Sequence, residues 1–472
     1  MPSYRYDPLS AQDASFLWAE SASTPMHIAV AFIADAGPLR NPAGGIDIER
    51  IRAFIASRLH SIPRYRQRLF FTPLRRRPVW VDDDHFNLEY HVRHAGLPRP
   101  GTAEQLKLLI GRISSIALDR ARPLWELWVV EGLEDGKRFA LISKVHHCMT
   151  DGVSGSELMT VLMSLSPMEE PGPLVPYVPR PAPSVLELRR DDLVDLATGP
   201  LQAARYVGEL LGAERRGELG RALRGVYDLV ASGIVPASET PLNREIGPHR
   251  RFDYFAQDLS SVKAVKDKLG GTLNDVVLAT VAGGIRRFLK RRRVDVSRLD
   301  FRVTTPVSVH SGTTGQALGN HVSAWIFPLP LAQADPVKRL ATIRATTRRL
   351  KESNQALGAD LLSAVTEWTG TTLLSIGTRL QTFGRTHNLI VTNVPGPQVP
   401  LFLLGAPLQE AYPIGPLFPN QAVIVALFSY AGRLFWGLNA DAALLPDLAD
   451  LRRDLEASFQ ELVDAAGTPS VD

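Results

Sequence analysis

A chain of 472 residues is longer than one hydrophobic core usually supports, so the sequence predicts two domains. Hydrophobic residues make up 45% and charged residues 22% of the chain, which is typical of a globular protein. The net charge is only +4, so nucleic acid is not the expected partner, and a single cysteine, Cys148, excludes a disulfide within the chain.

The first part of the chain alternates between predicted helices and strands. Ser10 has the position of a helix N-cap, with Asp13 three residues later. Apolar spacing predicts a strand, a helix, a second helix and a second strand at residues 25–33, 48–59, 103–118 and 122–130. Residues 1–18 lack the apolar core of a secretory signal, and no apolar run reaches the roughly 18 residues of a spanning helix. We therefore expect a cytoplasmic protein, either soluble or peripheral to a membrane.

Two features of this half have both a functional and a structural interpretation. His27 lies in the first predicted strand, where it is either a ligand or, more often, a structural histidine. Six arginines between residues 64 and 77 form either a site for the phosphate groups of a small molecule or of a lipid headgroup, or a solvated surface, and the solvated surface is favoured. They are Arg64, Arg66, Arg68, Arg75, Arg76 and Arg77.

The centre of the sequence places two adjacent histidines where a strand ends. Residues 138–143 form an apolar run typical of a buried strand, Lys144–Gly152 follows, and residues 156–165 have helical spacing. Side chains alternate along an extended chain, so His146 and His147 are expected to face opposite sides. One of them would then serve a reaction, and the other would pack or form hydrogen bonds.

Proline-rich sequence at residues 167–183 predicts an extended, semi-rigid connection between two halves. Residues 186–235 predict basic amphipathic helices, which either lie on an anionic membrane or, more commonly, pack on the protein body. The sequence thus predicts an N-terminal domain, a linker and a C-terminal domain at residues 1–165, 166–240 and 241–472.

The central motif resembles a known signature. Residues 146–152, His-His-Cys-Met-Thr-Asp-Gly, match the HHxxxDG motif of the CoA-dependent acyltransferase superfamily, which includes chloramphenicol acetyltransferase and the condensation domains of peptide synthetases. Further blocks follow in the family's order from Leu9 to Asp447, among them Pro123-Leu124-Trp125-Glu126, Gly319-Asn320-His321 and Asn393-Val394-Pro395-Gly396-Pro397. As an ordered set, they resemble the actinobacterial wax ester synthase/diacylglycerol acyltransferase family. One position departs from it, because His310 stands where most members carry arginine.

This resemblance implies an α/β (α+β) fold of two chloramphenicol-acetyltransferase-like subdomains. Each would be a mixed sheet with helices, and the reaction would take place in a tunnel between the halves, where ligand sites often lie. The implied activity is O-acyl transfer of a long-chain acyl group from acyl-CoA to diacylglycerol or to a long-chain alcohol, which makes triacylglycerol or wax esters. Acyl-CoA is then a co-substrate, no cofactor is implied, and a membrane or lipid-droplet surface is a further expected partner.

The family also implies the roles of the motif residues. His147 is the expected general base for direct attack of the alcohol on the thioester. His146, Asp151 and Gly152 are expected to support the motif. Asp151 either orients His147, as in a triad, or holds the loop together, and we favour the second role. Gly152 permits a backbone shape that a side chain would block.

Three residues outside the motif are candidates for substrate binding. Asn274 and Asp275 lie at the start of a predicted helix, where they line the site or cap the helix. Trp125 lies in a predicted strand, where a buried tryptophan is usually part of the core.

Other chemistries are less compatible with these residues. Cys148 is expected to point away from His147, so a covalent route is not favoured. Residues 152–156 fail the Gly-x-Ser-x-Gly pattern of a serine hydrolase, since Ser156 replaces the last glycine. No third ligand lies at zinc-like spacing from the two histidines, so no metal site is expected. The alternative functions are another CoA- or carrier-dependent acyltransferase of the superfamily and a non-catalytic lipid-binding relative.

Overall fold

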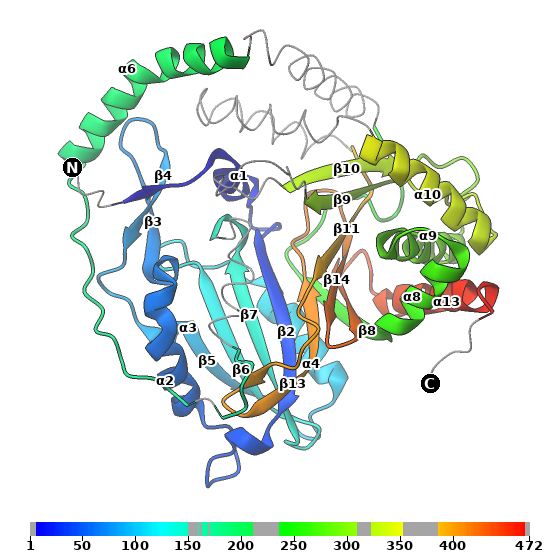
Figure 1. The fold of residues 1–472 in the computed structure, drawn as a ribbon, viewed down its shortest axis with the longest axis horizontal. Coiled ribbons are helices and arrows are strands. Elements are labelled where there is room, and N and C mark those ends of the chain that lie inside the picture. Colours follow the sequence, from blue (N-terminus) through cyan, green and yellow to red (C-terminus); the bar gives the residue numbers. More distant parts are fainter. Residues whose placement is uncertain are drawn as a thin grey trace.

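The computed structural model describes residues 6–149, 159, 163–168, 170–210, 236–308, 322–352 and 386–467. Within these ranges the chain forms two six-stranded mixed sheets, one small sheet and the helices that cover them (Figure 1). The expected mixed α/β class is therefore confirmed.

The N-terminal sheet has the strand order β12-β13-β2-β7-β6-β5. Neighbouring strands are antiparallel except for β5 and β6, which are parallel. Four of its described strands come from the first part of the chain: β2 (His27–Asp35), β5 (Val92–Gly96), β6 (Trp125–Leu133) and β7 (Arg138–His146). The other two, β12 (Phe402–Leu403) and β13 (Ala406–Ile414), come from the last part, so the expected boundary between the halves is crossed by one hairpin.

Helices and turns complete the N-terminal half at the places where the sequence has its capping residues. The side chain of Ser10 accepts a hydrogen bond from the backbone N–H of Asp13, which confirms the predicted N-cap of the first helix. The helices are α1 (Ala11–Ala19), α2 (Ile48–Arg58), α3 (Leu88–His91) and α4 (Ala103–Ser115). The 3-10 turns η1, η2 and η3 cover Gly37–Leu39, Leu59–Ser61 and Pro63–Arg66. A small sheet joins β1 (Asp7–Pro8), β4 (Pro78–Asp82) and β3 (Gln67–Phe71) in that order.

The C-terminal sheet has the strand order β10-β9-β11-β14-β15-β8. The strands β9, β11 and β14 run parallel and the outer pairs are antiparallel. In chain order the strands are β8 (Arg250–Asp258), β9 (Arg302–Ser308), β10 (Val322–Pro328), β11 (Leu389–Pro395), β14 (Val423–Tyr430) and β15 (Arg433–Asp441).

One face of the C-terminal sheet is covered by helices, and the other faces the N-terminal half. The helices are α8 (Leu259–Leu269), α9 (Leu273–Arg291), α10 (Pro336–Glu352) and α13 (Leu448–Ala465), and Figure 1 shows them on the outer side of the sheet. On the inner face, Phe252, Phe428 and Phe435 belong to the core of the N-terminal half. The two sheets therefore share one hydrophobic core, which fixes their relative positions.

Polar and aromatic contacts also hold the halves together. The ammonium group of Lys107, on α4, lies 2.7 Å from a carboxylate oxygen of Asp253 on β8. The rings of Tyr254, on β8, and Tyr412, on β13, stack with their centroids 3.9 Å apart. Both contacts are buried or half-buried, so they resist opening of the interface more than surface pairs would.

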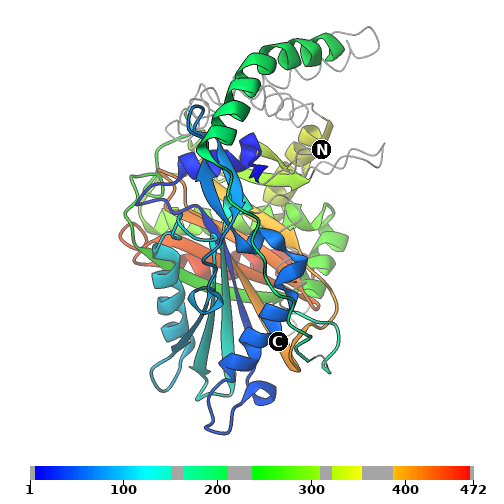
Figure 2. The same cartoon turned by 90° about the vertical axis from the view of Figure 1, so that its left-hand side faces the viewer.

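The expected linker leads into a long helix on the outside of the molecule. Residues 170–184 have no regular secondary structure, as their prolines predict, and α6 (Val185–Leu210) follows. Figure 2 shows α6 standing above the two sheets. In the part of the chain that the structure describes, we find no helix with both the length and the apolar character needed to cross a membrane.

Candidate active site

Strand β7 brings both histidines to one end of the N-terminal sheet. It ends at His146, and a single 3-10 turn, η4 (His147–Met149), begins at the next residue. The backbone N–H of His147 donates a hydrogen bond to the carbonyl of Met26, 2.8 Å away, just before β2. This bond fixes the point at which the His147 side chain leaves the backbone.

The imidazole of His147 lies flat against an aromatic ring. Its centroid is 3.8 Å from that of Phe16, and the two planes differ by 15°. Phe16 belongs to α1, which Figure 1 shows above the upper ends of β2 and β7. His147, taken as a whole residue, is half-buried.

Burial keeps His147 in its neutral form. It lowers the pKa of the ring to about 4, a hydrogen bond from the ring to the residue's own carbonyl opposes this, and the field of His146 lowers the pKa further. Only Nδ1 can reach that carbonyl, so Nδ1 carries the hydrogen and Nε2 keeps its lone pair. An imidazole in this form is suited to accept a proton.

His146 is buried and has different partners. Its Nδ1 accepts a hydrogen bond from the backbone N–H of Cys148 at 3.1 Å, and its Nε2 lies 3.5 Å from Oε1 of Glu20. That oxygen also accepts from the N–H of Met26 at 3.1 Å, while Oε2 accepts from Nε and Nη2 of Arg120 at 2.9 and 2.6 Å. Burial alone would raise the pKa of Glu20, but its contacts with His146, the N–H of Met26 and Arg120 outweigh burial and lower the pKa to about 2. An ionised carboxylate therefore lies beneath the two histidines.

His27 has the structural position that the sequence favoured. It pairs with His146 in the register of β2 and β7, and its side chain is buried. Burial lowers the pKa of His27 well below its usual range, and the charge of Lys144 acts in the same direction. The ring is therefore neutral in the folded protein.

Trp125 is buried in the core of the N-terminal half. It is opposite Val145 in the register of β6 and β7, so its side chain is on the face away from that of His146. Its indole N–H donates to the carbonyl of Tyr65 at 2.8 Å, and its ring stacks on His91 at 4.6 Å. These contacts favour the core role that the sequence left open.

Asn274 and Asp275 lie at the start of α9, on the helical side of the C-terminal sheet. Asp275 forms a capping box with Thr272 and accepts a hydrogen bond from the hydroxyl of Thr347 at 2.7 Å. Its described contacts are thus those of a helix cap. Asn274 is half-buried at the second position of the helix.

Several residues of the sequence motifs lie outside the described ranges. They are Asp151, Gly152 and His310, together with most of the helix expected at residues 156–165. At the end of that segment, Ser164 is not helical and instead pairs with Phe402 beside β12.

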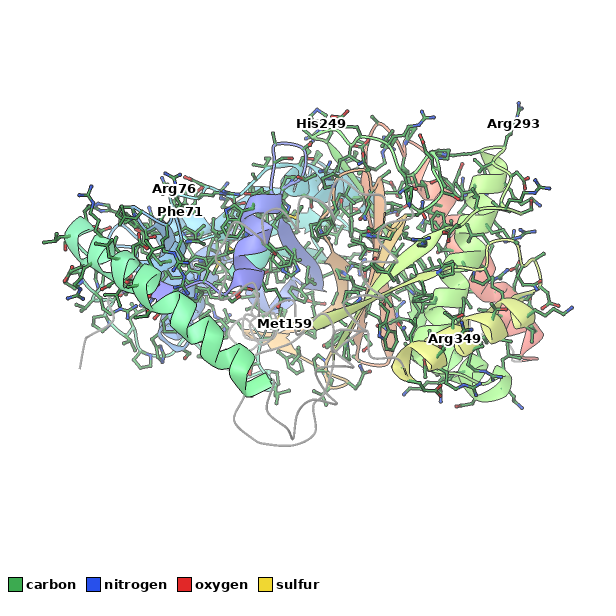
Figure 3. The ribbon with its side chains drawn as sticks, turned by 90° about the horizontal axis from the view of Figure 1, so that it is seen from above. Phe71, Arg76, Met159, His249, Arg293 and Arg349 are labelled. Atoms are coloured by element: carbon green, nitrogen blue, oxygen red, sulfur yellow. The ribbon has the colours of Figure 1, made fainter. Side chains whose placement is uncertain are left out.

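Cys148 and the six arginines between residues 64 and 77 have contacts that are consistent with structural roles. Cys148 is buried, and burial raises the pKa of its thiol well above the usual range, so it is not a thiolate nucleophile. Each arginine is close to an acidic or aromatic side chain. The pairs are Arg64 with Asp7, Arg66 with Tyr177, Arg68 with Asp83, Arg75 and Arg77 with Asp195, and Arg76 with Phe71. Figure 3 labels Arg76 and Phe71 at the β3–β4 hairpin.

Sequence reasoning missed the residues that surround the two histidines, namely Phe16, Glu20, Met26 and Arg120. One local signal was present, because Glu20 is an acidic residue at the C-terminal end of a predicted helix. A carboxylate is unfavourable there next to the helix dipole, so its position indicates a partner elsewhere in the fold.

Two domain families match the sequence. Residues 9–277 match the wax ester synthase/diacylglycerol acyltransferase catalytic domain, and residues 318–463 match the WS/DGAT C-terminal domain. A Mycobacterium tuberculosis protein (strain CDC 1551), provisionally named a diacylglycerol O-acyltransferase, is 33% identical over 469 residues. That alignment covers 97% of this chain and 90% of the relative.

Solved structures show the same architecture. The wax ester synthase/diacylglycerol acyltransferase from Marinobacter aquaeolei VT8 superposes with a TM-score of 0.67 at 27% identity, over 98% of this chain and 100% of that one. The first condensation domain of the calcium-dependent antibiotic synthetase superposes with a TM-score of 0.59 at 15% identity, over 100% and 98% of the two chains. The second likeness concerns the fold alone, and the two together confirm the expected chloramphenicol-acetyltransferase-like fold.

Proposed function

Since the chain belongs to the wax ester synthase/diacylglycerol acyltransferase family, we propose that it transfers a long-chain acyl group from acyl-CoA to the hydroxyl group of diacylglycerol or of a long-chain alcohol. The observation that carries this proposal is the neutral imidazole of His147, held in a fixed orientation at the end of β7. The products are then triacylglycerol or a wax ester, together with free CoA.

His147 acts as the general base in this proposal. Nε2 takes the proton of the acceptor hydroxyl as its oxygen attacks the thioester carbonyl, and a tetrahedral intermediate forms. When the intermediate collapses, the carbon–sulfur bond breaks and the imidazolium returns the proton to the CoA thiolate. General-base catalysis of this kind contributes about 100- to 10,000-fold to the rate. The thiol of Cys148 takes no part.

The remaining motif residues have supporting roles in the proposal. Asp151 and Gly152 hold the loop that follows η4, as the family motif implies. Asp275 maintains the start of α9, where it already caps the helix. Asn274, one position before it, is the candidate for a contact with substrate in the C-terminal half.

A panel of acceptors tests the proposed function. Purified protein is incubated with radiolabelled palmitoyl-CoA and, separately, with dioleoylglycerol, hexadecanol, butanol and no acceptor, and CoA release and ester formation are both measured. We expect ester formation with dioleoylglycerol, hexadecanol or both, at least tenfold above butanol. Binding of palmitoyl-CoA without ester formation from any acceptor would instead indicate a non-catalytic relative, and preferential transfer to butanol would indicate a different acyltransferase.

We also propose that the protein meets its lipid acceptor at a membrane or droplet surface through α6. Three acidic residues of this helix, Asp191, Asp192 and Asp195, have partners on the protein body. Asp192 accepts hydrogen bonds from the backbone N–H groups of Leu74 and Arg75 at 2.9 and 3.1 Å. Asp195 pairs with Arg77 at 3.1 Å.

The outer side of α6 is apolar and positively charged. Exposed apolar side chains on it are Val185, Leu186, Leu193, Val194 and Leu196. Of the charged residues in its described part, only Arg189 and Arg190 are classed as exposed. Apolar side chains with arginines between them suit the surface of an anionic lipid layer. Because acyl-CoA is made inside the cell, we place this surface on the cytoplasmic side.

Charged substitutions on α6 should weaken lipid binding. We expect the double variant Leu186→Glu/Leu193→Glu to bind vesicles of phosphatidylcholine and phosphatidylglycerol at least about tenfold more weakly than the wild type, because a buried leucine contributes about 1.5–3 kcal/mol. Co-flotation with the vesicles measures this. Leu108→Glu is the matched control, since Leu108 is an equally exposed leucine on α4. Equal binding by the double variant and the control would refute the role of α6.

A further inference from the structure

The side-chain carboxylate of Glu20 lies beneath η4, and its partners contact the first residues of this turn. Glu20 follows the last residue of α1, and its side chain is 7% exposed. Both of its oxygens have partners, and two of these partners, Met26 and His146, themselves hold a backbone N–H of η4.

The first connection passes through Met26. Oε1 of Glu20 accepts a hydrogen bond from the N–H of Met26 at 3.1 Å. The carbonyl of Met26 in turn accepts the N–H of His147 at 2.8 Å. The Glu20 carboxylate therefore fixes the position of Met26, whose carbonyl accepts the hydrogen bond from the N–H of His147.

The second connection passes through His146. The His146 Nε2 lies 3.5 Å from Oε1 of Glu20, which is longer than an ordinary hydrogen bond, and because a carboxylate can only accept, this approach favours a hydrogen on Nε2. The N–H of Cys148 can only donate, so the His146 Nδ1 at 3.1 Å must present a lone pair. Only the neutral Nε2–H tautomer of His146 satisfies both neighbours.

The third connection joins the carboxylate to the aromatic wall. Arg120 binds Oε2 of Glu20 through two nitrogens and also donates from Nη2 to the carbonyl of Leu17 at 2.8 Å. Leu17 follows Phe16 on α1, and Phe16 stacks on the ring of His147. The position of the stacking ring thus depends on the same ion pair.

We propose that Glu20 is a positioning residue for His147: it selects the Nε2–H tautomer of His146 and, with Met26 and Arg120, sets the turn and the aromatic wall that orient the base. This inference rests on the proposed function, in which His147 takes the proton of the acceptor. Glu20 itself touches neither substrate nor the reacting atoms.

Replacing Glu20 by glutamine tests the proposal, because the amide nearly preserves the shape and removes the charge. We expect Glu20→Gln to lower kcat for acyl transfer about 10- to 100-fold, the usual effect of losing a residue that orients a catalytic histidine, with KM for palmitoyl-CoA unchanged within twofold. Glu20→Asp, which restores a carboxylate, should recover part of the loss. A kcat of Glu20→Gln within twofold of the wild type would overturn the proposal.

Glu126→Gln is the matched control. Glu126 is also a buried carboxylate of the N-terminal half, and it lies 3.0 Å from Arg93 and 3.8 Å from Lys144, away from η4. Both variants are compared by thermal unfolding. If kcat of both falls only in proportion to the folded fraction, Glu20 has a merely structural role and the proposal fails.

A spectroscopic measurement separates this proposal from the proposed function. Nitrogen-15 NMR of histidine-labelled protein should show the His146 tautomer protonated at Nε2, assigned with a His146→Asn variant, and Glu20→Gln should change its population. This readout needs no substrate, so it tests Glu20 even if the wild type transfers no acyl group. A Glu20→Gln spectrum identical to that of the wild type would contradict the positioning role.

The His146→Asn variant provides a second test, which applies if Glu20→Gln does not fold, because it probes the contact between residue 146 and the N–H of Cys148 in η4. Its carbonyl oxygen can take the place of Nδ1 toward Cys148, so its kcat should exceed that of His146→Gln at least threefold, and equal values would count against the proposal.

Discussion

Replacing His147 by alanine is expected to lower kcat for acyl transfer by about 100- to 10,000-fold, because the variant has no group to take the proton of the acceptor hydroxyl. Palmitoyl-CoA binding should be retained, since the ring is placed to contact the reacting atoms rather than to hold the acyl chain. Stopped assays of CoA release with dioleoylglycerol or hexadecanol measure kcat, and equilibrium binding of palmitoyl-CoA measures the retained affinity.

His249→Ala provides the control for this experiment. His249 is exposed in the loop before β8, at the rim of the molecule in Figure 3, and its side chain can be removed without changing η4. This variant should have wild-type kcat. Loss of activity in both variants, or full activity of His147→Ala, would contradict the assignment of the base.

The pH dependence of the reaction follows from the same ring. A histidine usually has a pKa of about 6.5, whereas burial lowers the pKa of His147 to about 4. A lowered pKa means that the ring stays in its basic form as the pH falls. We therefore expect kcat/KM to remain constant from pH 7 to about pH 5 and to decline only below that. If kcat/KM instead fell with a midpoint near pH 6.5 while the protein was still folded, the activity of the free enzyme would not depend on the ionisation of His147.

A large effect on stability is expected from Gly437→Ala at the contact between the halves. A Cβ atom at this position on β15 would lie 1.8 Å from the carbonyl oxygen of Pro413 on β13, so one of two backbones must move. Overpacking of this kind costs about 3 kcal/mol. Chemical unfolding should show this loss of free energy of unfolding, and activity should fall with the separation of the halves.

Gly96→Ala is the matched control for this substitution. Gly96 also lies in a strand of a sheet, β5, but the nearest atom to a Cβ there is the Cγ of Glu131 at 4.0 Å. We expect its free energy of unfolding to change by less than about 0.5 kcal/mol. Similar losses of free energy of unfolding in the two variants would mean that the structure accommodates a Cβ atom at Gly437 without the expected clash with Pro413.

Local sequence patterns predicted most elements of the fold but not how distant elements pair. The strands at residues 25–33 and 138–143 are seen as β2 and β7, because their apolar runs encode burial directly. β13 was not predicted as a strand because it contains Pro407, Pro413 and the half-buried Glu410. Its register with β2 also shifts between residues 408 and 410. Such a segment does not have the pattern of an inner strand, and only its position in the folded chain makes it one.

The candidate site shows the same division. The position of His147 at a strand end followed from the residues just before it, and its role came from the resemblance of the motif. The environment of the ring could not be predicted from these residues, because Phe16, Glu20 and Met26 are more than a hundred residues away in sequence. The tautomer of His146 likewise depends on a carboxylate that no local pattern connects with it.

The insertion of β13 beside β2 has a consequence during synthesis. Until residue 414 has left the ribosome, β2 is an edge strand with one unpaired side and an apolar side chain at every position from Ile28 to Ala34, the kind of edge that recruits other chains. The nascent N-terminal half therefore stays vulnerable to aggregation for most of translation, and a chaperone that shields this edge would determine the yield of native protein.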